Sequence, residues 1–169
     1  MRIYVLLFGA FFIASASSQT LVEQVQKDDL VSMSDSDPAM SKAFARARAT
    51  LDSFLENART PTDGHTGFSL KVGIAEKSKV EYFWINSFVQ KADGTFEGEI
   101  ANEPRMVKTV KFGQRYSFAR AQIVDWTYID KAQRRMVGNF TLCALLNKES
   151  EQDAEAMKRR FKLDCDWLQ

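Results

Sequence analysis

Three glutamates in one short stretch have the residue type and spacing needed for acid–base catalysis. Glu97 and Glu99 alternate within TFEGEI (residues 95–100), so a strand there would carry both carboxylates on one face, and Glu103 follows three residues later. Paired carboxylates can hydrolyse glycosidic bonds, one acting as general acid and the other as base or nucleophile. A solvated strand face explains the same spacing, and the Pro after Glu103 equally indicates a turn. Hydrolysis is therefore one hypothesis among several.

The pair Asp125-Trp126 is the second candidate for a site. Trp126 could be a platform for a ligand with Asp125 as its polar partner. Alternatively, Trp126 could fill the core while Asp125 caps a turn through backbone N–H groups. Arginines flank this pair, including Arg135, and could form a basic rim for an anionic partner, although a solvated surface explains them too. The candidate ligand-binding residues are Trp126, Asp125, Arg115, Arg120, Arg134 and Glu103.

Other chemistries lack their sequence signatures. The single histidine, His65, lies in a GHTG loop, and the chain contains no G-x-S-x-G, Walker or dinucleotide-binding glycine pattern. Two cysteines and one histidine are too few for the usual metal sites, so we expect neither a metal nor a cofactor. A formal net charge of +1 argues against a nucleic-acid partner.

The N-terminus predicts export. Arg2 precedes an apolar run, residues 3–13, which is shorter than the roughly 20 residues that span a bilayer as a helix. The small residues around Ala14 and Ala16 fit signal-peptidase cleavage after Ala16 or Ser18. We therefore expect residues 1–18 to be a signal peptide, and the mature protein to be periplasmic or secreted without a stable membrane anchor.

Export changes the interpretation of Cys143 and Cys165, the two cysteines of the chain. An even number of cysteines in an oxidising compartment favours a disulfide, which in the chain-entropy model would contribute about 3 kcal/mol. The alternative is that Cys143 is a small buried apolar residue and Cys165 is a free thiol.

The periodicity of the chain predicts an α+β fold. After a loosely ordered lead-in (residues 19–36), Asp37-Pro38 marks the start of a helix that ends near Ala58, with an apolar stripe at spacings of three and four residues. Alternating segments then predict strands, and the final ones are 125–129 and 134–145. Gly138 would mark a bulge or a close approach, and a helix over 150–163 follows.

We expect residues 37–169 to form a single domain. Its sheet would be a bent antiparallel sheet, or a partly closed small barrel, of five to seven strands. One long N-terminal helix would pack on this sheet, and a C-terminal helix would finish the chain.

Several short motifs resemble a known family. They are FSLKVGI (68–74), YFWIN (82–86), FEGEIANEP (96–104), VKFGQRYSF (110–118), IVDWTYID (123–130) and MVGNFT (136–141). In this order they resemble the YegJ-type family of bacterial proteins, a domain of unknown function, over residues 37–145. The resemblance implies a small and often exported protein. It implies no activity, cofactor or catalytic residue, and the tail with Cys165 lies outside it.

These observations favour an exported, non-enzymatic binding or interaction module whose partner is an envelope protein or a peptide. The first alternative is a small periplasmic hydrolase that uses Glu97, Glu99 and Glu103. The second is an inhibitor or immunity-type protein that blocks a partner enzyme.

Overall fold

A computed structural model describes residues 37–168. The expected signal peptide (1–18) and lead-in (19–36) lie outside the described residues. The described elements, in chain order, are α2 (Pro38–Arg59), β1 (His65–Glu76), β2 (Lys79–Gln90), β3 (Phe96–Ile100), β4 (Arg115–Phe118), the 3-10 turn η1 (Arg120–Gln122), β5 (Ile123–Asp130), β6 (Arg135–Gly138), α3 (Phe140–Leu146), α4 (Glu151–Phe161) and η2 (Asp166–Leu168). Among residues 37–168, no helix has the length and apolar character needed to cross a bilayer.

Helix α2 begins where the sequence predicts. The carboxylate of Asp37 accepts a hydrogen bond from the N–H of Ala39 at 2.9 Å, and Pro38 occupies the first turn, where no intrahelical donor is needed. Six side chains on one stripe of α2 are buried against the sheet: Met40, Ala43, Phe44, Ala47, Leu51 and Phe54. Burial of this stripe, rather than helix propensity alone, fixes α2 on the sheet.

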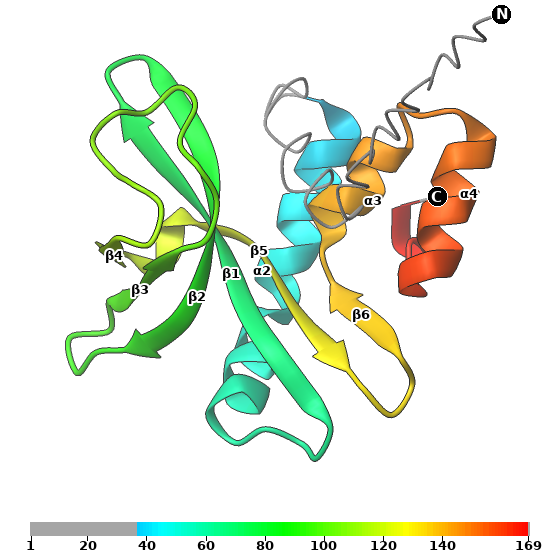
Figure 1. The fold of residues 1–169 in the computed structure, drawn as a ribbon, viewed down its shortest axis with the longest axis horizontal. Helices are drawn as coiled ribbons and strands as arrows, with labels where there is room; N and C mark the ends of the chain where they lie inside the picture. Colours follow the sequence, from blue (N-terminus) through cyan, green and yellow to red (C-terminus); the bar gives the residue numbers. More distant parts are fainter. Residues whose placement is uncertain (1–36, 169) are drawn as a thin grey trace, which may run out of the picture.

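The six strands form one antiparallel sheet in the order β4-β3-β2-β1-β5-β6. The first four strands form a meander, and β5 then joins on the other side of β1. The sheet is open, with β4 and β6 at its edges, and register shifts interrupt the β1–β5 and β2–β3 pairings. In Figure 1 the long strands β1 and β2 bend and twist, α2 crosses one face, and α3 and α4 lie together beyond β6. The bent antiparallel sheet with a helix packed on it is thus confirmed.

The predicted strand over 134–145 is wrong in its second half. Strand β6 ends at Gly138, and FTLCALL folds as α3 instead. The reason is a partner distant in sequence, since the N–H groups of Phe140 and Thr141 donate to the carboxylate of Asp125 and so begin a helix there. Gly138 is a close-approach point, as expected, because a Cβ at this position would overlap the carbonyl oxygen and the ring of Trp126.

The C-terminal part folds back and is fastened covalently. A disulfide joins Cys143 on α3 to Cys165 beyond α4, and both residues are buried. Leu142 and Leu146 of α3 and Ala154 of α4 form a second small apolar cluster. The tail that carries Trp167 is therefore held against α3, where the ring of Trp167 makes an edge contact with Phe140, 5.4 Å between centroids.

Candidate functional site

A groove lies between α2, the β5–β6 hairpin and the C-terminal tail. Its volume is about 920 Å³, within the usual range for ligand pockets, ~300–1,000 Å³. We call it the aromatic groove. Its lining is Arg46, Thr50, Asp52, Ser53, Phe54, Glu56, Asn57, Thr60, Thr62, His65, Trp126, Tyr128, Arg135, Met136, Val137, Gly138, Phe140, Asp164 and Trp167.

Aromatic rings from four elements, α2, β5, α3 and η2, line the groove. Trp126 and Tyr128 alternate along β5 and therefore project from the same side of the strand. Phe54 of α2 stacks on Trp126 with centroids 4.8 Å apart, and Phe140 meets the edge of Trp126 at 5.2 Å. Nε1 of Trp126 donates to the carbonyl oxygen of Ala47 at 3.1 Å, which ties the indole to α2. Trp126 is only 6% exposed, so it forms a fixed floor and not a mobile platform.

A polar cluster lies at one side of this floor. His65 begins β1, and Cα pairing places it beside Asp130, the last residue of β5. Nε2 of His65 lies 3.9 Å from the carboxylate of Asp130, and Nε of Arg135 lies 3.7 Å from the same oxygen. The ring of His65 also packs on Tyr128 at 4.7 Å. Burial raises the pKa of Tyr128, opposed by Arg135 and reinforced by Asp130.

Asn57 sets the orientation of His65. Oδ1 of Asn57 accepts from the N–H of Thr62, and Nδ2 of Asn57 lies 3.0 Å from Nδ1 of His65. Oδ1 of Asn57 lies 3.2 Å from the same Nδ1, so Asn57 offers a partner to either tautomer of His65, while Nε2 faces Asp130. The imidazole is thus held from both sides.

Helix α2 contributes a second, polar stripe to the groove. Arg46, Thr50, Ser53 and Asn57 follow one another at helical spacings of four, three and four, so they share one face. This stripe lies next to the apolar one that packs on the sheet.

Arg135 and Arg46 are the cations of the lining, and both lack hydrogen-bond partners among residues 37–168. Nε of Arg135 is sealed from solvent and donates to no atom there. The guanidinium of Arg46 makes neither an ion pair nor a hydrogen bond with the described residues. By contrast, Asp52 pairs with Arg120 at 2.8 Å and Glu56 with Arg59 at 3.0 Å. The acids of the lining are therefore partnered more fully than its arginines.

Asp125 lies outside the groove and is fully buried. Its carboxylate accepts from the N–H groups of Trp126, Phe140 and Thr141 and from the hydroxyl of Thr141, at 2.7–3.2 Å. Lys71 donates to that hydroxyl at 2.9 Å and lies over the ring of Trp84. Burial raises the pKa of Asp125 to about 6, against the opposing effects of Lys71 and the donated hydrogen bonds. These contacts connect β5 to α3, and they leave Asp125 no access to a groove ligand.

The predicted arginine rim is dispersed. Arg115 lies on β4 and Arg134 in the β5–β6 turn, so they belong to opposite edges of the sheet. Arg120 lies in η1 and pairs with Asp52 on α2. Of the arginines flanking Asp125-Trp126 in the sequence, Arg135 is the one that lines the groove.

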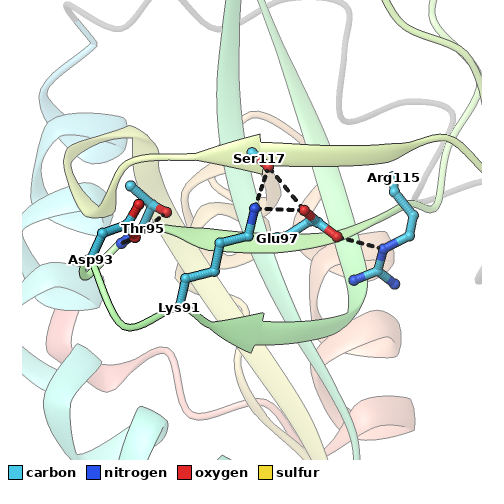
Figure 2. A network of polar contacts seen from close by, with 6 residues as sticks. All are labelled: Lys91, Asp93, Thr95, Glu97, Arg115 and Ser117. Carbon is cyan, nitrogen blue, oxygen red and sulfur yellow. Dashed lines mark hydrogen bonds and ion pairs between the residues drawn. The ribbon is translucent and has the colours of Figure 1, made fainter.

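Of the three glutamates, Glu97 belongs to a surface network of polar contacts, which Figure 2 shows. Glu97 on β3 accepts from Lys91 at 2.6 Å, from Arg115 at 2.8 Å and from the hydroxyl of Ser117 at 3.1 Å. The hydrogen bonds from Lys91, Arg115 and Ser117 lower the pKa of Glu97 to about 2. Such a carboxylate stays ionised and saturated, which does not suit a general acid.

The other two glutamates do not complete a site. Glu99 and Glu103 are exposed, and neither lines the groove. Within residues 37–168, no three His, Cys, Asp or Glu side chains are grouped in a way that could hold a metal ion.

The sequence interpretation missed Asn57, Asp130 and Arg46 and did not assign His65 to a site. A signal was present in the sequence, since Trp126, Tyr128 and Asp130 alternate along the predicted strand 125–129 and the residue that follows it. The helical spacing of the polar residues on α2 is a second signal. Neither of these two sequence patterns reveals that β5 and α2 enclose a groove, because the packing of the helix on the strand is not encoded in either pattern alone.

Comparisons with known proteins agree with the resemblance in the motifs. The family described as "Uncharacterized protein conserved in bacteria (DUF2314)" matches residues 37–165, a range that extends past Leu145 and includes Cys165. The "Uncharacterized protein YegJ" of Escherichia coli (strain K12) is 28% identical over 160 residues, covering 95% of this chain and 97% of that protein. No solved structure matches this chain significantly.

Proposed function

The chain belongs to the DUF2314 family of conserved bacterial proteins, and from this premise we propose that it is an exported, non-enzymatic binding module. The ligand, a small molecule or a peptide segment of an envelope protein, would occupy the aromatic groove. One observation carries the proposal. The groove combines a fixed aromatic floor with guanidinium groups that lack hydrogen-bond partners among the described residues.

Two features support the part of this proposal that places the protein outside the cytoplasm. The signal-like N-terminus and the buried Cys143–Cys165 disulfide both fit an oxidising compartment. The disulfide also holds the tail that completes the groove, so an oxidising compartment would favour the binding-competent form. Mass spectrometry of the mature protein would test this setting, with an N-terminus at residue 17 or 19 and no free thiol as the expected result.

A binding role also fits the rigidity of the groove. Trp126 is tied to α2 through its indole nitrogen, and its ring is held between Phe54 and Phe140. A preorganised aromatic floor lowers the ordering cost of binding. The lining also contains the hydroxyl groups of Ser53, Thr50 and Thr62, but the ring of His65 hydrogen-bonds to Asn57 and to none of these hydroxyls within residues 37–168.

The test uses a variant that fills the groove. Ser53→Trp would place a bulky ring in the groove from the polar stripe of α2, and Ala49→Trp places the same ring on an exposed position of the same helix that does not line the groove. Wild type and both variants are used to select binders from a displayed peptide library and from a metabolite extract of the envelope. Binding is then mapped by two-dimensional NMR.

We expect ligands that bind wild type and Ala49→Trp, shift resonances of Trp126 and Tyr128, and lose at least about tenfold in affinity with Ser53→Trp. Recovery of no ligand, or binding that Ser53→Trp leaves intact, would overturn the proposal. Turnover of a cell-wall or ester substrate that Glu97→Gln abolishes would favour the hydrolase instead.

A further inference from the structure

We infer that the aromatic groove selects ligands in which an oxyanion is attached to an apolar or aromatic body. One of the two lining arginines, Arg135 beside Asp130 or Arg46 beside Ala47, would receive the oxyanion, and Trp126 and Tyr128 would contact the body. The inference deepens the proposed binding function and rests on it, because it assigns a chemical class to the ligand of the same groove.

Arg135 supplies the first argument. Its Nε is buried without a hydrogen bond, and the nearest carboxylate oxygen, on Asp130, is 3.7 Å away, beyond hydrogen-bond range. The same oxygen is also shared with His65, at 3.9 Å. Asp130 therefore holds the guanidinium in place without saturating its donors. A guanidinium offers a planar set of donors that matches a carboxylate or phosphate. Because Nε is sealed, a ligand oxyanion would bind the other nitrogens of the guanidinium, since the side chain as a whole is 38% exposed.

The charges of the lining supply the second argument. Its acids on α2, Asp52 and Glu56, are neutralised by Arg120 and Arg59, which do not line the groove. Oδ1 of Asp164 accepts from the N–H of Asp166. The lining arginines have no such compensation beyond the long contact of Arg135 with Asp130, and Arg46 is without an ion pair among the described residues. Asp164 has no cation partner among the described residues, so the preference for an anion is local to the two arginines and is not a property of the whole groove.

The position of the aromatic residues supplies the third argument. Tyr128 lies between Trp126 and Asp130 on one side of β5, and Val137 and Met136 of β6 are its neighbours across the hairpin. The apolar floor is therefore next to the guanidinium of Arg135, which precedes Met136. A neutral apolar ligand would use the floor alone, and a free inorganic anion would use the arginines alone. The arrangement fits a molecule that carries both parts.

The experiment compares matched probes by NMR titration of the full mature chain. N-acetyl-L-phenylalanine carries a ring and a carboxylate, as the free C-terminus of a peptide does, and phenyl phosphate carries a ring and a phosphate. N-acetyl-L-phenylalaninamide has the same body as the first probe without the charge. We expect both anions to bind at least about tenfold more tightly than the amide, and to shift resonances of Tyr128 and Val137. A difference between the two anions would identify the source of the oxyanion.

Variants assign the preference to residues. At least one of Arg135→Gln and Arg46→Gln should weaken anion binding about fivefold or more while leaving amide binding unchanged, and the variant that does so identifies the arginine that holds the oxyanion. Arg134→Gln is the matched control, since it removes the same charge from the adjacent, exposed position of the hairpin and should change neither. Arg46 has no partner to lose among the described residues, so its variant keeps the test valid if Arg135→Gln unfolds the hairpin.

Equal affinity for the amide and the anions would overturn the inference but leave groove binding intact. The same holds if the Arg46 and Arg135 variants behave as Arg134→Gln does. If neither anion binds, the inference also fails, and the selection with Ser53→Trp decides the proposed function independently.

Discussion

Strand β5 carries two buried carboxylates five residues apart, and they differ in how their oxygens are used. Asp125 is 0% exposed and accepts hydrogen bonds from Trp126, Phe140 and Thr141. Asp130 is 4% exposed and accepts one hydrogen bond in the described residues, from the N–H of Gln133 at 3.0 Å. Its cationic neighbours, His65 and Arg135, remain 3.9 and 3.7 Å away.

This difference separates a structural role from a binding role. A buried carboxylate that accepts several hydrogen bonds has no remaining capacity for a ligand, and its removal leaves donors unsatisfied. A buried carboxylate whose cationic neighbours lie beyond hydrogen-bond distance positions those side chains without fully neutralising their charge. Asp125 and Asp130 are both buried but differ in their hydrogen bonds. Those of Asp125 serve the fold, whereas Asp130, which does not itself line the groove, lies behind two residues that do, His65 and Arg135.

The largest expected effect comes from deleting each carboxylate. Asp125→Ala removes the acceptor for the first N–H groups of α3 and leaves them buried, so it should lower the free energy of unfolding by about 3–5 kcal/mol. Asp130→Ala loses one hydrogen bond and longer ion pairs, and should cost about 1–2 kcal/mol. Urea denaturation followed by circular dichroism measures both. Equal losses would remove the distinction between the two residues.

Gly138 connects the two regions, because it ends β6 beside the groove and lies two residues before the α3 start that Asp125 caps. Its φ is +78°, and a Cβ would overlap Trp126. Gly138→Ala should therefore cost about 2–4 kcal/mol from backbone strain and overpacking together. Gly94→Ala is the control, because Gly94 has φ +82° but nothing within 4 Å of an added Cβ, and it should cost about 1 kcal/mol. Thermal and urea unfolding of both variants measure the two losses in free energy of unfolding. Equal losses would show that the backbone at Gly138 does not approach Trp126 closely.

The pH dependence of stability tests the state of Asp125. Its pKa rises from 3.8 to about 6 on folding, so the folded state binds the proton more tightly than the unfolded state. The contribution of this group to stability is thus fully present below pH 3.8 and is lost as pH rises through 6. The free energy of unfolding lost over this pH range is roughly 2–3 kcal/mol. The free energy of unfolding is measured against pH for wild type and for Asp125→Asn. The difference between the two curves isolates the pH dependence that Asp125 contributes. A difference that instead grows with pH would mean that the donated hydrogen bonds outweigh burial.

The smallest effect concerns Glu97, a surface carboxylate that is as fully partnered as Asp125 but not buried. Its pKa is lowered to about 2, so its contribution to stability is present above pH 4.5 and is lost as pH falls through 2. Carbon-13 NMR should find this low pKa in wild type and a value nearer 4.5 in Arg115→Ala and Lys91→Met. An unchanged pKa in both variants would show that the network of Figure 2 is not formed in solution.

The sequence predicts the parts of this protein that depend on neighbours along the chain. Asp37-Pro38 marks the start of α2, the strands follow from alternation, and the two cysteines are bonded. The helix α3 was predicted as strand because the acceptor that begins it, Asp125, is 15 residues away. The groove was missed for the same reason, since its polar cluster combines α2, β1, β5 and β6, and no local pattern states which of them meet.

The strand order has a consequence for the time at which the groove can form. Strands β1 to β4 pair with their sequence neighbours, through short loops between β1, β2 and β3 and a longer connection, residues 101–114, between β3 and β4. By contrast, β5 must return across the intervening strands to pair with β1. Closing the loop between β1 and β5 is the slower step. The groove depends on β5, β6 and the disulfide-bound tail, so it should be the last region to gain protection during refolding. Pulse-labelled hydrogen exchange would contradict this order if the amides of β5 were protected before those of β1 and β2.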